Sequence, residues 1–278
     1  GLGDVYKRQL HTKVAVYMLY RLWVQLFDMD ERWGGLIIVI MIISMLVGSF
    51  GGLAENSIRR VLGYQMLNGM PFILVMMAFT THDAQRALAA GILYTIHHMI
   101  TVGSLILASG AIEETYGTGR LNKLSGLARR DPIIAWIFAA GAFSVVGFPP
   151  FSGMWGKVLI VAEIARTGGG WAWTVIAVII IASFAAFLAM LRVWRRVFWG
   201  KDLPKEKVPK ELVIRKKLMA PSAALILGSL TMFILSGPLI EVTMEASADL
   251  LDTDAYSHAV LGDEPVALPD IDSIQEGR

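Results

Sequence analysis

The sequence contains no cysteine among its 278 residues, which excludes disulfides, cysteine-bound iron–sulfur clusters and thiol nucleophiles. It also lacks a phosphate-binding loop, a dinucleotide-binding fingerprint and any cluster of side chains with the spacing of metal ligands. We therefore expect no cofactor and no metal site. If the protein drives an energy-requiring process, we expect an ion gradient or a partner to supply the energy.

Charged side chains are scarce, at 17% of the residues, whereas hydrophobic residues make up 55% and the mean hydropathy is +0.57. This composition is typical of a membrane protein rather than of a soluble domain with a large core. The apolar residues form about seven spans that are separated by polar loops. We predict an all-α, polytopic membrane protein whose transmembrane domain occupies residues 10–240.

The expected spans lie at residues 10–27, 33–53, 61–80, 87–112, 133–165, 171–193 and 218–240. Residues 1–9 are polar and stop abruptly before the first span, so we interpret them as a possible non-native leader and exclude them from the fold. Residues 241–278 form an acidic tail that is expected to be mostly soluble. The first part of this tail has apolar residues at helical spacing, which is compatible with a helix on the membrane surface.

Basic residues alternate between the two ends of the expected bundle. The loops around residues 55–60, 113–131 and 194–217 carry most of them, whereas each opposite loop carries a single arginine. Lysine and arginine accumulate in loops on the cytoplasmic side of membranes. We therefore predict that these three loops are cytoplasmic and that the acidic tail lies outside.

The span at residues 133–165 cannot run straight through a membrane. Its 33 residues would form a helix about 50 Å long, against a hydrocarbon core of about 30 Å. Pro149 and Pro150 remove two backbone donors, and Gly147 and Gly153 loosen the backbone around them. We predict a broken helix here. Such a break survives in a membrane where protein or a water-filled cavity satisfies the freed backbone groups.

Lys157 follows the predicted break by about two helical turns. A lysine inside a span costs about 2.5–3.5 kcal/mol on insertion scales, so its presence needs a reason. A broken helix with a buried cation is typical of ion handling. The alternative is a proline kink followed by a lysine whose head group reaches the membrane interface.

Four further polar side chains, Lys13, Asn68, His97 and His98, fall within apolar spans. Lys13 could be an end lysine that reaches the interface, and Asn68 could form a hydrogen bond between helices. His97 and His98 point about 100° apart on a helix, so we expect one to line a path and the other to pack. Because histidine can take and pass protons, we consider Lys13, His97, His98 and Lys157 a candidate proton path.

Four stretches, TKVAVYMLYR, SIRRVLGY, LYTIHHM and GFPPFSGMWGK, occur in a familiar order and spacing. In these stretches the chain resembles the antiporter-like membrane subunits shared by respiratory complex I and the Mrp-type multisubunit Na+/H+ antiporters. The tail LLDTDAYSHAVLG is similar to the end of the D-type subunit of Mrp antiporters and not to complex I. The resemblance covers residues 10 to about 262.

The resemblance implies two inverted five-helix repeats, each with a broken helix, and a midplane chain of buried lysines and histidines. Residues 33–193 would be the whole second repeat, so the sequence would be a C-terminal fragment that lacks the first repeat. Lys13 would match the lysine that bridges the repeats, His98 a relay histidine, and Lys157 the lysine of the second broken helix.

Two positions depart from the family pattern. Many relatives carry a lysine four residues after the second histidine, where this chain has Val102. The stretch SIRRVLGYQMLNG also departs from the serine-rich version of the family after Tyr64. A proton would then pass between His98 and Lys157 by a different route, or through water.

The resemblance implies a proton-translocating membrane subunit of a multisubunit Na+/H+ antiporter, multi-pass in a bacterial cell membrane. Such a subunit would be a secondary transporter subunit rather than an enzyme. The expected partners are other membrane subunits, H+, Na+ and the lipid bilayer, and not a nucleic acid. One alternative is a proton-pumping membrane subunit of a respiratory NADH dehydrogenase-type oxidoreductase. A further alternative is a scaffold that conducts nothing.

Overall fold

The computed structural model describes residues 2–201 and 212–262. The basic loop expected around residues 194–217 and the acidic tail expected at 241–278 therefore lie partly outside the described residues. Within the described ranges the chain forms helices and no β-strand, apart from one isolated bridge between Ser57 and Arg120. The predicted all-α fold is confirmed.

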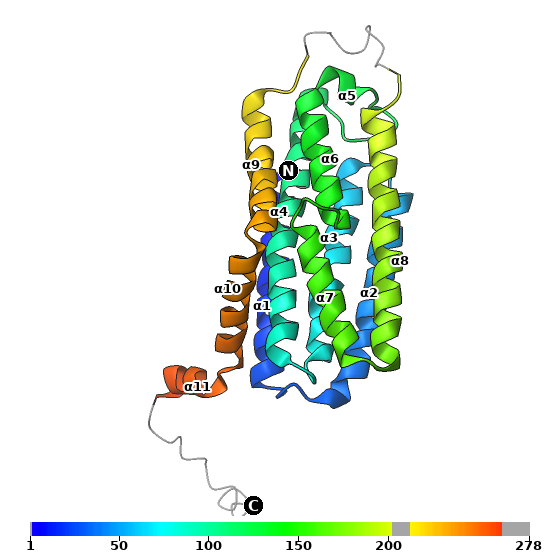
Figure 1. Cartoon of the computed structure of the whole chain (residues 1–278). Helices are drawn as coiled ribbons and strands as arrows, with labels where there is room; N and C mark the ends of the chain where they lie inside the picture. Colours follow the sequence, from blue (N-terminus) through cyan, green and yellow to red (C-terminus); the bar gives the residue numbers. More distant parts are fainter. Residues whose placement is uncertain (1, 202–211, 263–278) are drawn as a thin grey trace, which may run out of the picture.

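The long helices form an upright bundle (Figure 1). They are α1 (Leu2–Gln25), α2 (Gly34–Ala54), α3 (Ile58–Leu74), α4 (Ala84–Tyr116), α6 (Pro132–Val146), α7 (Gly153–Thr167), α8 (Gly169–Val193), α9 (Lys216–Ile234) and α10 (Ser236–Leu251). The short ones are η1 (Glu31–Trp33), η2 (Val75–Phe79), α5 (Leu127–Arg130), η3 (Trp194–Phe198) and α11 (Thr253–Leu261).

Several described helices are long and apolar enough to cross a membrane. They are Glu31–Ala54, Ile58–Phe79, Ala84–Tyr116, Gly169–Phe198 and Lys216–Ile234. A shorter apolar helix, α6, stacks end to end with α7, so the pair runs the length of the bundle (Figure 1). The prediction of a multi-pass membrane protein is confirmed.

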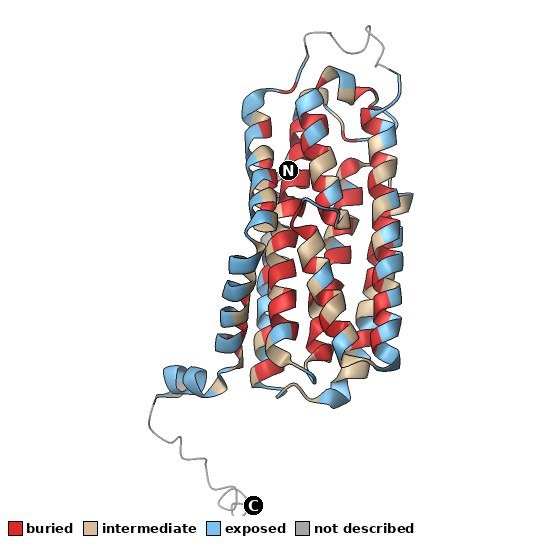
Figure 2. Ribbon diagram, viewed as in Figure 1, coloured by how far each residue is buried: buried red, intermediate tan, exposed pale blue. Residues whose placement is uncertain are grey.

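Helix α4 is the centre of the bundle. It packs against α1, α3, α6, α7, α9 and α10, and most of its residues are buried, including His97 and His98. The outer faces of α8, α9 and α10 are largely exposed, as Figure 2 shows. Polar groups on α4 therefore face neighbouring helices, which is the arrangement that makes buried histidines tolerable in a membrane.

The break between α6 and α7 occupies residues 147–152. Gly147 ends α6 with a φ of 101°, a left-handed conformation that favours glycine, and its N–H donates to the carbonyl oxygens of Phe143 and Ser144. The peptide bond between Pro149 and Pro150 is cis. The chain thus leaves the axis of α6 and begins α7 at Gly153, in the middle of the bundle.

The C-terminal part of the chain differs from the expectation. The boundary expected at residues 240/241 falls inside α10, which continues from α9 after an irregular residue, Leu235. Thr243, Ser247 and Leu250 form a buried stripe on α10, and the Ser247 hydroxyl donates to the Gln85 carbonyl oxygen at 2.8 Å. Because this stripe faces α4, α10 packs along the bundle instead of lying on a membrane surface.

Two smaller differences concern the first and third spans. Helix α1 already begins at Leu2, so it includes the described residues 2–9 of the segment interpreted as a leader. Helix α3 is not interrupted at Asn68 or Gly69 and continues through Pro71 to Leu74. The chain then tightens into the 3-10 turn η2.

Candidate proton path at the helix break

Lys13 and His98 contact each other directly in the bundle interior. Lys13 on α1 is 6% exposed, and its Nζ lies 2.9 Å from His98 Nδ1 and 3.5 Å from Met70 Sδ. A lysine ammonium can only donate, so Nδ1 accepts and the imidazole proton of a neutral His98 sits on Nε2. His98 Nε2 lies 3.3 Å from the Gln65 carbonyl oxygen, which accepts a hydrogen bond from the Nε2–H group. Lys13 is therefore held by the bundle and does not extend to an interface.

Gly69 makes room for the His98 ring on α3. A Cβ at this position would lie 1.9 Å from His98 Nε2 and 2.1 Å from Cδ2. Carbon atoms in contact normally stay about 3.5–4.0 Å apart. Any larger residue at position 69 would displace the imidazole, so this glycine determines where His98 meets Lys13.

His97 points toward the helix break and joins a ring of hydroxyl groups. Its Nδ1 lies 2.7 Å from Ser152 Oγ and 3.3 Å from Thr101 Oγ1. Ser229 Oγ on α9 lies 2.8 Å from Ser152 Oγ and 2.9 Å from Ser144 Oγ, and Ser144 Oγ lies 2.9 Å from Thr101 Oγ1. All five side chains are buried. The two histidines thus have separate polar partners, in different directions.

Lys157 reaches back across the break from the second turn of α7. Its Nζ donates to the Val146 carbonyl oxygen at 2.7 Å and to Ser183 Oγ on α8 at 2.9 Å, and it lies 5.3 Å from the centre of the Phe72 ring. The last carbonyls of a helix have no partner within it, so a lysine there satisfies α6 and complements its negative end. Lys157 is half-buried, whereas Lys13 is buried.

Aromatic rings fill the space between the two histidines and Lys157. The Tyr94 ring centre lies 5.3 Å from that of His97, 6.1 Å from that of His98 and 5.5 Å from that of Phe72. In the part of the chain that the structure describes, no hydrogen bond joins His98 to His97 or either histidine to Lys157. The arrangement therefore brings Lys13 and His98 together but leaves a gap before Lys157.

The α3 side of this region contains unpartnered polar atoms. Both side-chain amide atoms of Gln65 and Oδ1 of Asn68 are buried and have no hydrogen-bond partner among the described residues. Buried amides in this state are ordinarily satisfied by internal water. Val102, where relatives carry a lysine, is fully buried in an apolar cluster and supplies no polar group.

The sequence did not predict the hydroxyl partners, which are Thr101, Ser144, Ser152, Ser183 and Ser229. Thr101 lies four residues after His97, on the same face of α4, and this spacing could have identified it. Ser152 lies inside the GFPPFSGMWGK stretch. The remaining serines are single small polar residues in apolar helices, which no local pattern distinguishes from packing residues.

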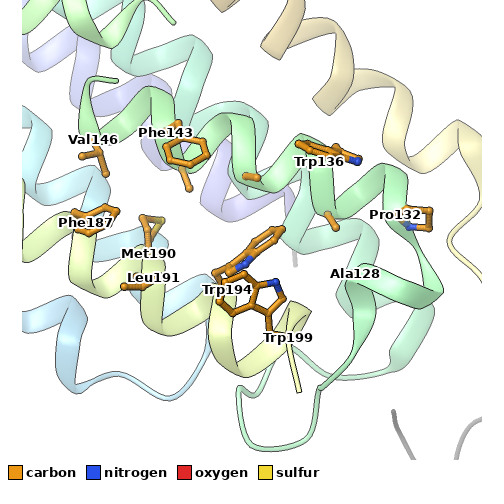
Figure 3. A pocket seen from close by; sticks show the side chains of 13 residues that line it. Ala128, Pro132, Trp136, Phe143, Val146, Phe187, Met190, Leu191, Trp194 and Trp199 are labelled. Carbon is orange, nitrogen blue, oxygen red and sulfur yellow. The ribbon is translucent and has the colours of Figure 1, made fainter. Parts of the chain in front are cut away.

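An apolar groove of about 510 Å³ lies elsewhere, between α6 and the α8–η3 helix (Figure 3). Trp136, Phe143, Phe187, Trp194 and Trp199 are its large lining residues. Its lining contains no charged side chain and none of the candidate path residues. The groove suits an apolar occupant and not an ion, so the polar interior of the bundle is the candidate functional site.

This fold defines a polytopic helical membrane protein with a helix broken in mid-bundle, a half-buried lysine beside the break and a buried lysine in the bundle interior, a combination typical of ion transporters. The chain belongs to the family described as NADH:quinone oxidoreductase/Mrp antiporter, transmembrane, whose model matches residues 9–188.

Curated relatives carry a more specific name. The chain is 30% identical over 256 residues to the D-type Na+/H+ antiporter subunit of Bacillus subtilis, and 27% identical over 254 residues to that of Alkalihalophilus pseudofirmus. Each alignment covers 91% of this chain and 50% of the relative. The chain therefore spans about half the length of the curated relatives that it matches.

Solved structures show the same likeness. The chain matches a chain of the Mrp complex from Dietzia sp. DQ12-45-1b with a TM-score of 0.81 and 31% identity, covering 90% of this chain and 53% of that one. It matches a chain of respiratory complex I from Thermus thermophilus with a TM-score of 0.72 and 22% identity, covering 86% and 50%. The second likeness shows the shared fold alone.

Proposed function

We propose that this chain belongs to a proton-translocating membrane subunit of a multisubunit Na+/H+ antiporter in a bacterial cell membrane, where it works with other membrane subunits. The family, the curated relatives named as D-type antiporter subunits and the likeness to an Mrp complex at 31% identity support this proposal. The transported ions would be H+ and Na+. The second repeat of the antiporter-like fold would occupy residues 33–193.

The contact between Lys13 and His98 is the observation that carries the proposal. Two buried titratable groups 2.9 Å apart share one hydrogen bond, so a proton can pass from the lysine ammonium to His98 Nδ1 without an intervening water. The step leaves a neutral lysine and an imidazolium, whose Nε2–H still donates to the Gln65 carbonyl oxygen. Histidine and lysine can each release the proton again.

The path from this pair to Lys157 requires water or side-chain rotation, because no hydrogen bond spans the gap in the described chain. Lys157 has a flexible four-carbon stem, and His97 lies between the pair and the helix break. The break supplies polar backbone at the level where a straight apolar helix would offer none. Lys13, His98, His97 and Lys157 would then form the proton path.

Substitution of Lys13 tests the proposed function. In the complete protein with its partner subunits, Lys13→Arg keeps the charge but cannot release a proton, so Na+/H+ exchange in everted membrane vesicles should be lost. Arg21→Lys is the control, because Arg21 lies on the same helix and contacts Tyr17 and Tyr256 instead of the histidines. Wild-type exchange by Lys13→Arg at normal complex abundance would contradict the proposal.

A second candidate is a proton-pumping subunit of a respiratory oxidoreductase, because the family description covers both classes and the complex I fold matches. Such a subunit would move protons only during electron transfer. Exchange driven by an imposed Na+ gradient, in vesicles without an electron donor, would support the antiporter. Proton movement that requires the electron donor would support the oxidoreductase.

A further inference from the structure

We propose that Ser229 of α9 is a relay hydroxyl of the proton path, in the sense that its hydrogen bonds reverse when His97 gains or loses a proton, an inference that rests on the proposed function. Ser229 lies outside residues 9–188, which match the family model. Its helix would otherwise be considered a peripheral span, since its outer face is exposed. The ring of hydroxyls at the helix break brings α9 into the path.

Ser229 is fully buried and contacts both ends of the broken helix. Its Oγ lies 2.9 Å from Ser144 Oγ in the last turn of α6 and 2.8 Å from Ser152 Oγ just before α7. The Ser152 N–H also donates to Ser229 Oγ at 3.4 Å. One hydroxyl from a third helix therefore joins the two halves across the break, next to His97.

The ring supports both states of His97 Nδ1. When Nδ1 has no proton, it accepts a hydrogen bond from Ser152. Ser152 then accepts one from Ser229, Ser229 from Ser144, and Ser144 from Thr101. When Nδ1 carries a proton, it donates to Ser152 and the hydroxyls turn the other way. A serine or threonine hydroxyl both donates and accepts, so each stays bonded in either direction.

Ser229 occupies the middle of this sequence of hydroxyls. When His97 Nδ1 has no proton, Ser229 donates to Ser152 and accepts from Ser144; when Nδ1 carries a proton, Ser229 accepts from Ser152 and donates to Ser144. Ser229 stays neutral in both states, and because the ring closes on His97 through Thr101, the proton itself enters and leaves at His97. Without the Ser229 hydroxyl, Ser152 has no acceptor on the far side when His97 Nδ1 is protonated. A buried hydroxyl without a partner is unfavourable, so the loss of Ser229 would oppose protonation of His97 and slow the transfer.

The same helix offers a matched control. Ser222 is also fully buried on α9, and it forms a reciprocal pair with Ser104 on α4, with an Oγ–Oγ distance of 2.9 Å. The Ser222 hydroxyl further approaches the Ser104 carbonyl oxygen at 2.7 Å. This pair links α9 to α4 as the ring does, but it contacts neither histidine. The loss of this pair in Ser222→Ala therefore measures only the structural cost of removing a buried hydroxyl contact between α9 and α4.

The test compares Ser229→Ala, Ser229→Thr, Ser229→Val and Ser222→Ala in the complete protein with its partner subunits. Threonine and valine have nearly the same shape, so Ser229→Thr and Ser229→Val place the same burden on folding and differ in the hydroxyl. We expect Na+/H+ exchange per assembled complex to fall at least tenfold in Ser229→Ala. Ser229→Thr should exchange at least tenfold faster than Ser229→Val. Ser222→Ala should stay within twofold of wild type.

The maximal rate should fall while the apparent Na+ affinity stays unchanged, because Ser229 handles the proton. Equal rates for Ser229→Thr and Ser229→Val would overturn the relay role, as would an equal loss in Ser222→Ala and Ser229→Ala. Lys13→Ala, measured in the same vesicles, separates the two proposals. If Lys13→Ala abolishes exchange and Ser229→Ala does not, the relay role fails while the proposed function stands.

Discussion

Replacement of Gly69 by alanine probes the contact between Lys13 and His98 without removing either group. The added Cβ would lie 1.9 Å from His98 Nε2, about 1.5–2 Å closer than a normal contact. The imidazole must move by a comparable distance, because the clash is with its ring and the Cβ belongs to the helix backbone. Such a shift exceeds what a hydrogen bond of 2.9 Å to Lys13 can absorb.

The expected stability change is small, which makes the functional change interpretable. Alanine in a helix interior is favoured over glycine by about 0.8–1.0 kcal/mol, whereas overpacking a core costs about 1–3 kcal/mol. The net destabilisation is therefore about 0–2 kcal/mol, which a large membrane bundle tolerates. We expect Gly69→Ala to assemble at near-normal abundance and to lose most of its Na+/H+ exchange.

Gly63→Ala is the matched control on the same helix. A Cβ at Gly63 would meet no atom within 4 Å, so this variant gains the helix preference of alanine without a clash. Its exchange should equal that of the wild type, and its thermal midpoint should not fall. Exchange and complex abundance are measured in everted vesicles for both variants. Normal exchange in Gly69→Ala would refute the reasoning, because the observed Lys13–His98 geometry would then be dispensable.

Three further predictions concern other parts of the chain. Lys157→Ala and Lys157→Arg should both abolish exchange at unchanged abundance, because a guanidinium stays charged; wild-type exchange by the arginine variant would make Lys157 an anchor. Gln65→Met should slow exchange and should not raise the thermal midpoint, because we expect internal water to hydrogen-bond to the Gln65 amide. A higher midpoint with normal exchange would indicate that the site holds no water. A cysteine at Ser257, exposed on α11, should react with an impermeant maleimide from outside intact cells; reaction only after permeabilisation would reverse the predicted orientation.

The helices and the break were accessible to sequence reasoning because their causes are local. Apolar runs long enough to cross a membrane indicated the spans. The two prolines between Gly147 and Gly153 removed the donors that a continuous helix needs. The packing of α10 was not accessible in the same way. Its acidic exposed residues suggested a soluble tail, while the buried stripe that includes Ser247 is recognised only once α4 lies beside it.

The contacts of the candidate site depend on segments far apart in the sequence. Lys13 and His98 are 85 positions apart, and Ser152 and Ser229 are 77 positions apart. Serine and threonine in helices also bond to their own backbone, as Thr95 does to the Gly91 carbonyl oxygen at 2.8 Å. A hydroxyl in an apolar span therefore carries no signal about which helix it faces, and this hid the ring at the break.

The contacts of Lys157 couple the geometry of the helix break to the charge of the lysine. A helix that ends in mid-bundle leaves carbonyl oxygens without partners, and an ammonium that donates to Val146 compensates both the carbonyl and the negative end of α6. A lysine that gives up its proton loses part of that compensation, so its charge state and the geometry of the break are coupled. The Ser183 hydroxyl can hydrogen-bond to the head group with or without its charge, whereas the attraction of the Phe72 ring requires the charge. The contacts of Lys157 thus stabilise the broken helix, and loss of the lysine proton would change the geometry of that break.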